Sequence, residues 1–198
     1  MNDKEFIYNS ESSVQTQQEP QFVSYEIIGS DSIILSQVTE EYDFTDTSYD
    51  PIEIASRLVE TAKTFNLFGL SANQCGLKHR VCVIGNDDQY VAFFNPTILE
   101  FSEDTIVLPE MDINNVGLTL NIKRPKSIVV QYTTYEGEEK VMRLEGLTSR
   151  VLQQQIDRLN GITFNSNVSP IKLKRSQKSL SKKVKKYIRQ NIVVKKGI

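Results

Sequence analysis

The residues most able to do chemistry lie in one segment near the C-terminal end, from Arg150 to Gly161. A helix that binds zinc through the pattern H-E-x-x-H presents two histidines one turn apart, and the glutamate beside the first moves a proton. Here those three positions hold Gln154, Gln155 and Arg158. A guanidinium has no lone pair to give a cation, and an amide cannot take up a proton. The segment therefore predicts the frame of such a helix without its ligands or its base.

An amphipathic helix must present these side chains. It is predicted from about Leu147 to Asn160, and Gly161 is expected to end it. Gln155 falls on the same broad face as Leu152 and Ile156, among other apolar residues. We therefore expect the Gln155 amide to be buried or half-buried, where it needs hydrogen-bond partners.

The rest of the chain predicts an α+β fold, with mixed or antiparallel sheets around this central helix. Another helix is expected after Asp50-Pro51, with Asp50 as the N-cap and Pro51 at the first helical position. A hairpin turn is expected at Glu136-Gly137. Strands are predicted at residues 25–28, 33–38, 81–84, 90–94, 127–133 and 140–144.

Charge divides the chain into an acidic body and a basic tail. Residues 165–198 carry 11 of the 23 Lys and Arg, whereas all 25 Asp and Glu lie at or before Asp157. We predict a flexible polar arm at residues 1–21, a domain at 22–164 and a basic tail at 165–198 with a helix from about 177 to 192. Either this helix is simply solvated, or it meets an anionic surface. The binding residues would then be Lys182, Lys183, Lys185, Lys186 and Arg189.

The remaining reactive side chains are few. Two cysteines, Cys75 and Cys82, are too few for a disulfide framework or a structural zinc site, so both are expected to be reduced and packed. A pair of Cys75 with His79, the one histidine, is conceivable, but His79 is expected to be a surface residue. Because no apolar run is long enough for a membrane span and no signal peptide begins the chain, we expect a cytoplasmic protein.

Three separate segments resemble the signature segments of peptide deformylases. Leu67-Phe68-Gly69-Leu70-Ser71-Ala72-Asn73-Gln74 is similar to the family's G-φ-G-φ-A-A-x-Q, although Leu67 replaces its first glycine. Glu110-Met111-Asp112-Ile113-Asn114 is placed on E-G-C-φ-S by counting back from a K-R-P-K stretch. The segment from Gln153 to Gly161 is similar to Q-H-E-φ-D-H-L-x-G and keeps the positions that support the helix.

The resemblance implies a metalloenzyme fold that removes the formyl group from the N-terminal methionine of new proteins. It implies that Gly69, Leu70 and Glu110 belong to a substrate groove and that Gln74 polarises the formyl oxygen. The family's cysteine and two histidines that bind the metal correspond to Asp112, Gln154 and Arg158, and its general base corresponds to Gln155. These would then be vestigial metal and catalytic positions.

The sequence thus predicts a protein of this family that is not an enzyme and needs no metal or other cofactor. An Asp112–Arg158 salt bridge would stand where the metal stood, or else Arg158 would extend to solvent. The expected role is a structural or binding module, with a bacteriophage virion as one expected place. Its partners would be neighbouring proteins, with ribosome or RNA as another choice and no membrane. The alternative is a residual metal-dependent peptide deformylase, or a protein that binds formyl-peptides or the ribosome.

Overall fold

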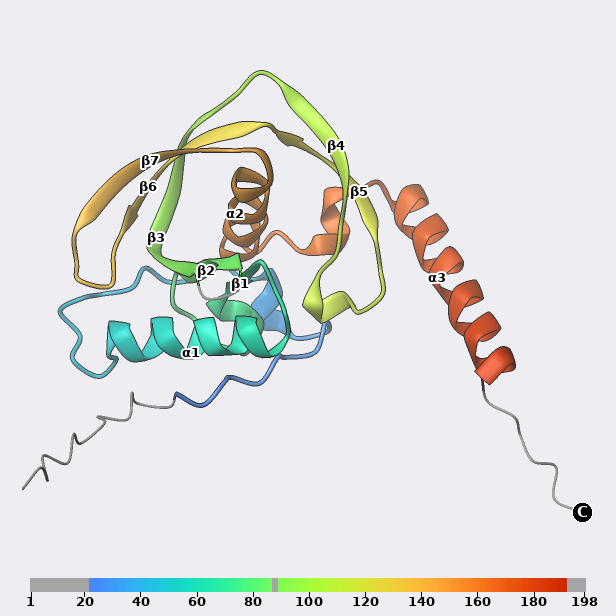
Figure 1. The fold of residues 1–198 in the computed structure, drawn as a ribbon, viewed down its shortest axis with the longest axis horizontal. Helices are drawn as coiled ribbons and strands as arrows, with labels where there is room; N and C mark the ends of the chain where they lie inside the picture. Colours follow the sequence, from blue (N-terminus) through green and yellow to red (C-terminus); the bar gives the residue numbers. More distant parts are fainter. Residues whose placement is uncertain (1–21, 87–88, 192–198) are drawn as a thin grey trace, which may run out of the picture.

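The computed structural model describes residues 22–86 and 89–191 as two antiparallel sheets and three α-helices (Figure 1). The larger sheet has five strands in the order β1-β2-β3-β6-β7, and β4 pairs with β5 as a separate ribbon. The strands are β1 (Gly69–Ser71), β2 (Val81–Asn86), β3 (Gln89–Phe101), β4 (Thr105–Glu110), β5 (Leu120–Pro125), β6 (Ser127–Thr133) and β7 (Glu139–Glu145). The helices are α1 (Pro51–Thr64), α2 (Gly146–Leu159) and α3 (Pro170–Asn191). The predicted α+β class is confirmed.

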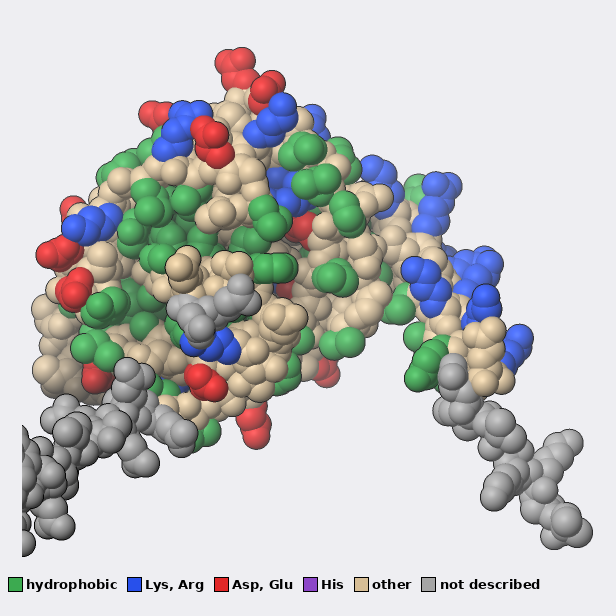
Figure 2. Space-filling view, in the orientation of Figure 1, with side chains coloured by type: hydrophobic (Ala, Val, Ile, Leu, Met, Phe, Trp, Pro, Cys, Tyr) green, Lys and Arg blue, Asp and Glu red, His purple; other side chains and the backbone are tan. Residues whose placement is uncertain are grey.

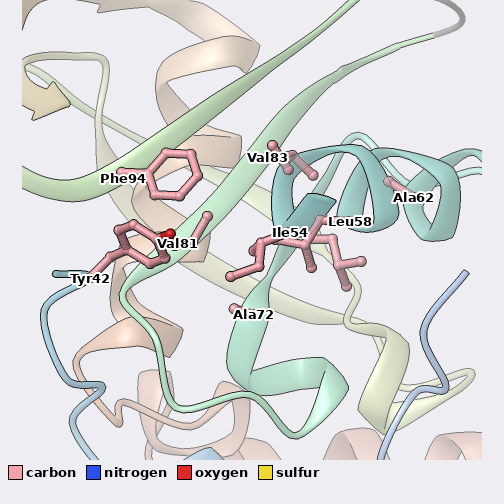
Figure 3. Packing of buried hydrophobic residues seen from close by; sticks show 10 residues of the cluster. Tyr42, Ile54, Leu58, Ala62, Ala72, Val81, Val83 and Phe94 are labelled. Atoms are coloured by element: carbon pink, nitrogen blue, oxygen red, sulfur yellow. The ribbon is translucent and has the colours of Figure 1, made fainter. Parts of the chain in front are cut away.

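Helix α1 begins as its sequence predicts. The Asp50 side chain accepts a hydrogen bond from the Ile52 N–H at 2.9 Å, and Pro51 occupies the first turn, where its missing N–H costs nothing. Its buried face packs against β1 and β2 in the first hydrophobic cluster (Figure 3). Leu58 is fully buried in that cluster.

Helix α2 lies at the centre of the fold, where the curved sheet passes over it (Figure 1). Leu152, Ile156 and Leu159 pack against β2, β3 and β6 in the second cluster. Gly161 follows the helix at φ +71°, and a Cβ there would lie 2.8 Å from the Ser36 carbonyl oxygen. The predicted stop at Gly161 is therefore confirmed, because the left-handed backbone and the close approach both require glycine.

Some predicted strands are right and others are wrong. Residues 127–133 form β6 as predicted, and those at 81–84, 90–94 and 140–144 are found as parts of longer strands. Residues 25–28 form no regular element, and Ile33–Ser36 is a 3-10 helix. Both pieces have β-forming side chains, but they line up beside no strand that could extend a hydrogen-bond ladder.

Helix α3 starts earlier than the apolar spacing predicts and projects from the body (Figure 1). Leu173 and Leu180 pack against the third cluster, which holds Leu120, Ile122 and Phe164. In the described residues no helix has the length and apolar character to cross a membrane. The arm at 1–21 lies outside the described residues, and the domain boundary at 164 stays a prediction.

Replacing Leu58 by Ala should lower the free energy of unfolding by about 2–5 kcal/mol, because it removes buried apolar surface and leaves a cavity. Denaturant titration measures this loss. Ile52→Ala is the matched control on the same helix, since the Ile52 side chain is 52% exposed. Equal losses in the two variants would contradict the packing described for α1.

Candidate functional site

A groove opens between the two sheets, with α2 as its floor. One wall comes from residues 65–69, which lead into β1, and the other from residues 109–113 and 116–117, at the end of β4 and beyond it. Its volume is about 500 Å³, which is within the range of ligand pockets. Both β1 and β4 are edge strands of their sheets. The apolar side chains that line the groove are Phe65, Leu67, Phe68, Pro109, Met111, Ile113, Val116, Leu147 and Val151.

Below this groove, the predicted salt bridge between Asp112 and Arg158 is confirmed. The Arg158 Nη2 donates to Asp112 Oδ2, and the two side chains are 4% and 1% exposed, respectively. Asn115 Nδ2 donates to the other Asp112 oxygen at 2.8 Å. Burial lowers the pKa of the Arg158 guanidinium below its usual value, while the Asp112 carboxylate acts in the opposite direction. The competing expectation, that Arg158 extends to solvent, is wrong.

Three glutamines surround this pair, and the structure places all of them on the groove lining. Gln74 Nε2 donates to Asn114 Oδ1 at 2.8 Å, and its Oε1 accepts from the Ser71 N–H at 3.1 Å. Gln154 Nε2 donates to the Met111 carbonyl oxygen at 2.7 Å. Gln155 is buried as expected, but its Oε1 accepts no hydrogen bond. The partner that a buried amide oxygen requires is therefore missing inside the described chain.

A second buried ionic cluster, which no sequence motif predicted, connects α2 to the β4–β5 ribbon. Arg124 Nε donates to Glu110 Oε1 at 2.6 Å and Arg124 Nη1 to Asp157 Oδ2 at 2.8 Å. Arg150 Nε lies 2.8 Å from the same Glu110 oxygen. The Arg150 guanidinium also donates to the Ile122 carbonyl oxygen at 2.5 Å. No local pattern marks Arg124 or Arg150, because their acidic partners are distant in the sequence.

The residues present do not fit the divalent metal that the resemblance implies. Among residues 22–86 and 89–191, no three His, Cys, Asp or Glu side chains gather in a group that could hold a metal. Asp112 is the one carboxylate at the three expected positions, and its oxygens already accept from Arg158 and Asn115. Transition metals favour imidazole and thiolate, and a fixed guanidinium repels a dication.

The side chains of three other residues considered from the sequence do not line the groove. The Leu70 side chain is fully buried in the first core cluster and does not line the groove, unlike Gly69 beside it. Burial raises the pKa of the Cys75 thiol to about 12. His79 packs against the rings of Tyr42 and Tyr49. At neutral pH Cys75 stays protonated, which argues against a Cys75/His79 nucleophile pair.

The family model described as polypeptide deformylase matches residues 24–174. The chain belongs to the peptide deformylase family. It is 31% identical over 169 residues to a protein of Rickettsia conorii named "Peptide deformylase-like", covering 83% of this chain and 89% of that one. It is also 31% identical to the peptide deformylase of Rhizobium meliloti, over 70% of this chain and 82% of that one. The solved peptide deformylase of Ehrlichia chaffeensis in complex with actinonin has 28% identity and a TM-score of 0.72, covering 81% of this chain and 98% of that chain.

These relatives bear on two predictions and contradict one of them. The prediction that the chain is not an enzyme is wrong, because similar proteins such as that of Rhizobium meliloti are named peptide deformylases and the one of Ehrlichia chaffeensis was solved with actinonin. That prediction rested on the chemistry of a few side chains, whereas the comparisons extend over most of the chain. The comparisons also give no support to a place in a bacteriophage particle. The cytoplasmic location stays a prediction.

Replacing Asp112 by Asn should lower the free energy of unfolding by about 3–5 kcal/mol, because the buried Arg158 guanidinium loses its counter-charge. The double variant Asp112→Asn/Arg158→Met should lose less than the two single variants together. Guanidinium unfolding of all four proteins gives the coupling energy.

The control is the surface pair of Lys140 and Glu138, whose side chains are 49% and 60% exposed. Glu138→Gln should leave stability almost unchanged, because water screens this pair. Strict additivity of the Asp112 and Arg158 replacements would show that the buried pair is not coupled.

Proposed function

We propose that this member of the peptide deformylase family binds the amino-terminal end of formylated peptides in the groove above α2. The single observation that carries the proposal is the groove itself, with apolar walls at the ends of two edge strands. An edge strand offers unpaired backbone groups, so an extended peptide can add to it as a further strand. An unbranched apolar side chain such as methionine suits the apolar walls.

The exposure of the wall residues supports this occupant. Phe68, Met111, Val116 and Leu147 are all more than half exposed although they are large apolar residues. A contiguous exposed apolar surface of this kind marks a binding site more often than an isolated exposed side chain does. The proposal concerns binding, because the side chains below the groove do not fit the metal on which a reaction step would depend.

Val116→Asp should weaken binding of the tripeptide formyl-Met-Ala-Ser by roughly tenfold or more, because a carboxylate on the groove wall must be desolvated when the peptide binds. Val116 is 80% exposed, so the replacement should leave the fold intact. Isothermal titration calorimetry measures the affinity. Formate released from the same peptide is measured in parallel, because the relatives are named deformylases.

The matched control is Val23→Asp, since Val23 is 75% exposed and does not line the groove. This variant should bind the tripeptide as the unmodified protein does. If both variants bind equally well, the peptide does not occupy this groove. If the unmodified protein binds no formylated peptide at all, the proposed function fails.

A second candidate role concerns α3, which carries nine Lys and Arg and no Asp or Glu. Figure 2 shows these basic side chains along the helix where it leaves the body. The side chains predicted to bind are all exposed on α3, namely Lys182, Lys183, Lys185, Lys186 and Arg189. We propose that they contact the phosphates of RNA; a contact with neighbouring proteins is the competing prediction.

Binding of a single-stranded RNA should weaken steeply as salt is added, because each phosphate that a basic side chain neutralises releases counterions. Fluorescence anisotropy at several salt concentrations gives the slope. Replacement by Ala of Lys182, Lys183, Lys185 and Lys186 together should reduce that slope by up to about 0.7 for each phosphate that is no longer neutralised. A control replaces four lysines of the body, namely Lys78, Lys123, Lys126 and Lys140. Affinity that does not change with salt would exclude binding through phosphates.

A further inference from the structure

Strand β7 forms an open edge of the larger sheet. It pairs with β6 on one side and lies on the outside of the fold (Figure 1). The isolated bridges found among residues 22–86 and 89–191 join other segments, so no described residue pairs with its free side. The pairing of β7 with β6 has no register shift, whereas that of β3 with β6 is irregular. β7 is therefore a regular edge strand, to which a further strand can be added.

The backbone of β7 divides its hydrogen-bonding groups between the two sides. Just beyond one end of the strand, the Gly146 N–H donates to the Lys126 carbonyl oxygen at 3.0 Å. Beyond the other end, the Thr134 N–H donates to the Glu138 carbonyl oxygen at 2.8 Å. Because hydrogen-bonded and non-hydrogen-bonded residue pairs alternate along an antiparallel ladder, the even-numbered residues of β7 bond to β6. The odd-numbered residues, Val141 among them, direct their N–H and C=O groups away from the sheet.

The side chains on the exposed face of β7 are suited to a second copy of the same strand. Val141 is 62% exposed, and Glu139 and Arg143 lie two residues before and after it on the same face. When a two-fold axis relates the copies, the residue on the axis faces itself and its neighbours face each other. With Val141 on the axis, Glu139 of each copy lies opposite Arg143 of the other. Opposite charges at directly opposed positions stabilise an antiparallel pair.

Charge also disfavours the competing registers. Residues directly opposite each other share one face of the joined sheet, so the axis passes through a residue of β7. An axis at Val141 or Arg143 pairs five residues of each copy, and one at Met142 pairs all seven. The axis at Met142 brings Glu139 opposite Glu145, and the axis at Arg143 brings that arginine opposite its own copy. Like charges directly opposite each other destabilise the pair, which leaves the axis at Val141.

Arg143 already has partners within its own chain, but these contacts are weak. Its Nε lies 2.9 Å from Glu145 Oε1, and the two side chains are 63% and 69% exposed. Its Nη2 donates to Ser127 Oγ at 3.2 Å. Water screens an ion pair of this exposure, so it contributes little to stability. The guanidinium can therefore turn to Glu139 of a second copy at small cost.

We propose that two copies of this chain join through β7, antiparallel and with Val141 on the two-fold axis. The Val141 N–H of each copy then donates to the Val141 carbonyl oxygen of the other, and the two five-stranded sheets become one continuous sheet. The peptide groove adjoins β1, at the opposite edge of the sheet, and no residue of β7 lines it. Both grooves of such a dimer stay open, so the inference does not depend on the proposed function.

Analytical ultracentrifugation of the full chain tests the charge pairing. Glu139→Arg and Arg143→Glu should each weaken the dimer roughly tenfold, because each replaces two attractive pairs per dimer by two repulsive ones. The double variant Glu139→Arg/Arg143→Glu restores opposite charges and should recover the affinity of the unmodified protein. The matched control is Glu103→Arg, which makes the same change of charge at an exposed residue between β3 and β4.

Cysteine cross-linking tests the register. In the proposed dimer Lys140 lies opposite Met142 of the second copy, as a non-hydrogen-bonded pair whose Cα atoms are about 4.5 Å apart, within the range of a disulfide. A mixture of Lys140→Cys and Met142→Cys should give a disulfide-linked dimer on mild oxidation, whereas neither variant alone should. The unmodified protein is the control for the native cysteines, of which Cys75 is half-buried and Cys82 is buried.

Val141→Pro separates dimerisation from folding. Its missing N–H is the one at the axis and not one that bonds to β6, so the variant should be a monomer that unfolds at nearly the same denaturant concentration. A dimer that survives Val141→Pro overturns the proposal, because the copies then meet elsewhere. A cross-link of Met142→Cys alone contradicts the proposed axis. An unmodified protein that stays monomeric at every concentration measured also refutes the dimer.

Discussion

The buried ion pair between Asp112 and Arg158 connects the loop after β4 to helix α2, and the geometry of the groove depends on it. Neither side chain reaches water, so each charge depends on the other for its stabilisation. Glu110, Arg124 and Arg150 add a second connection between α2 and the β4–β5 ribbon. Because the ribbon is not hydrogen-bonded to the larger sheet as a ladder, these polar contacts hold one groove wall in place.

This ionic arrangement also sets the character of the groove. A divalent ion at the base of a pocket would attract anionic or strongly polar ligand groups. Here the buried carboxylates and guanidinium groups balance one another, and the walls above them are apolar. These features agree with the proposed binding of an extended peptide with an apolar side chain.

The family membership is a property of the whole chain, whereas the side chains below the groove concern one site. Membership follows from a match that extends over residues 24–174 and from a similar fold in solved deformylases. Scaffold positions of the third signature segment, such as Gln153, Asp157 and Gly161, support α2 and do not perform chemistry. Gln153 donates to the Pro125 carbonyl oxygen, and Asp157 accepts from Arg124. The replaced positions at Asp112, Gln154 and Arg158 describe one donor set, and the names of the relatives contradict the prediction that was based on it.

The sequence by itself determined helices α1 and α2, the Asp50 cap, the stop at Gly161 and strand β6, because these depend on local periodicity and backbone preference. The resemblance to the family's metal-binding segments also implied an Asp112–Arg158 pair, with Arg158 extending to solvent as the alternative, and the structure contains the pair. Only the tertiary structure decided the rest. Strand β4 was missed because its residues before Glu110 are exposed and carry no alternating pattern. Residues 25–28 form no strand because they lie beside no strand with which they pair. Likewise, the missing partner of Gln155 and the partners of Arg124 and Arg150 depend on the packing of distant segments, which no local pattern encodes.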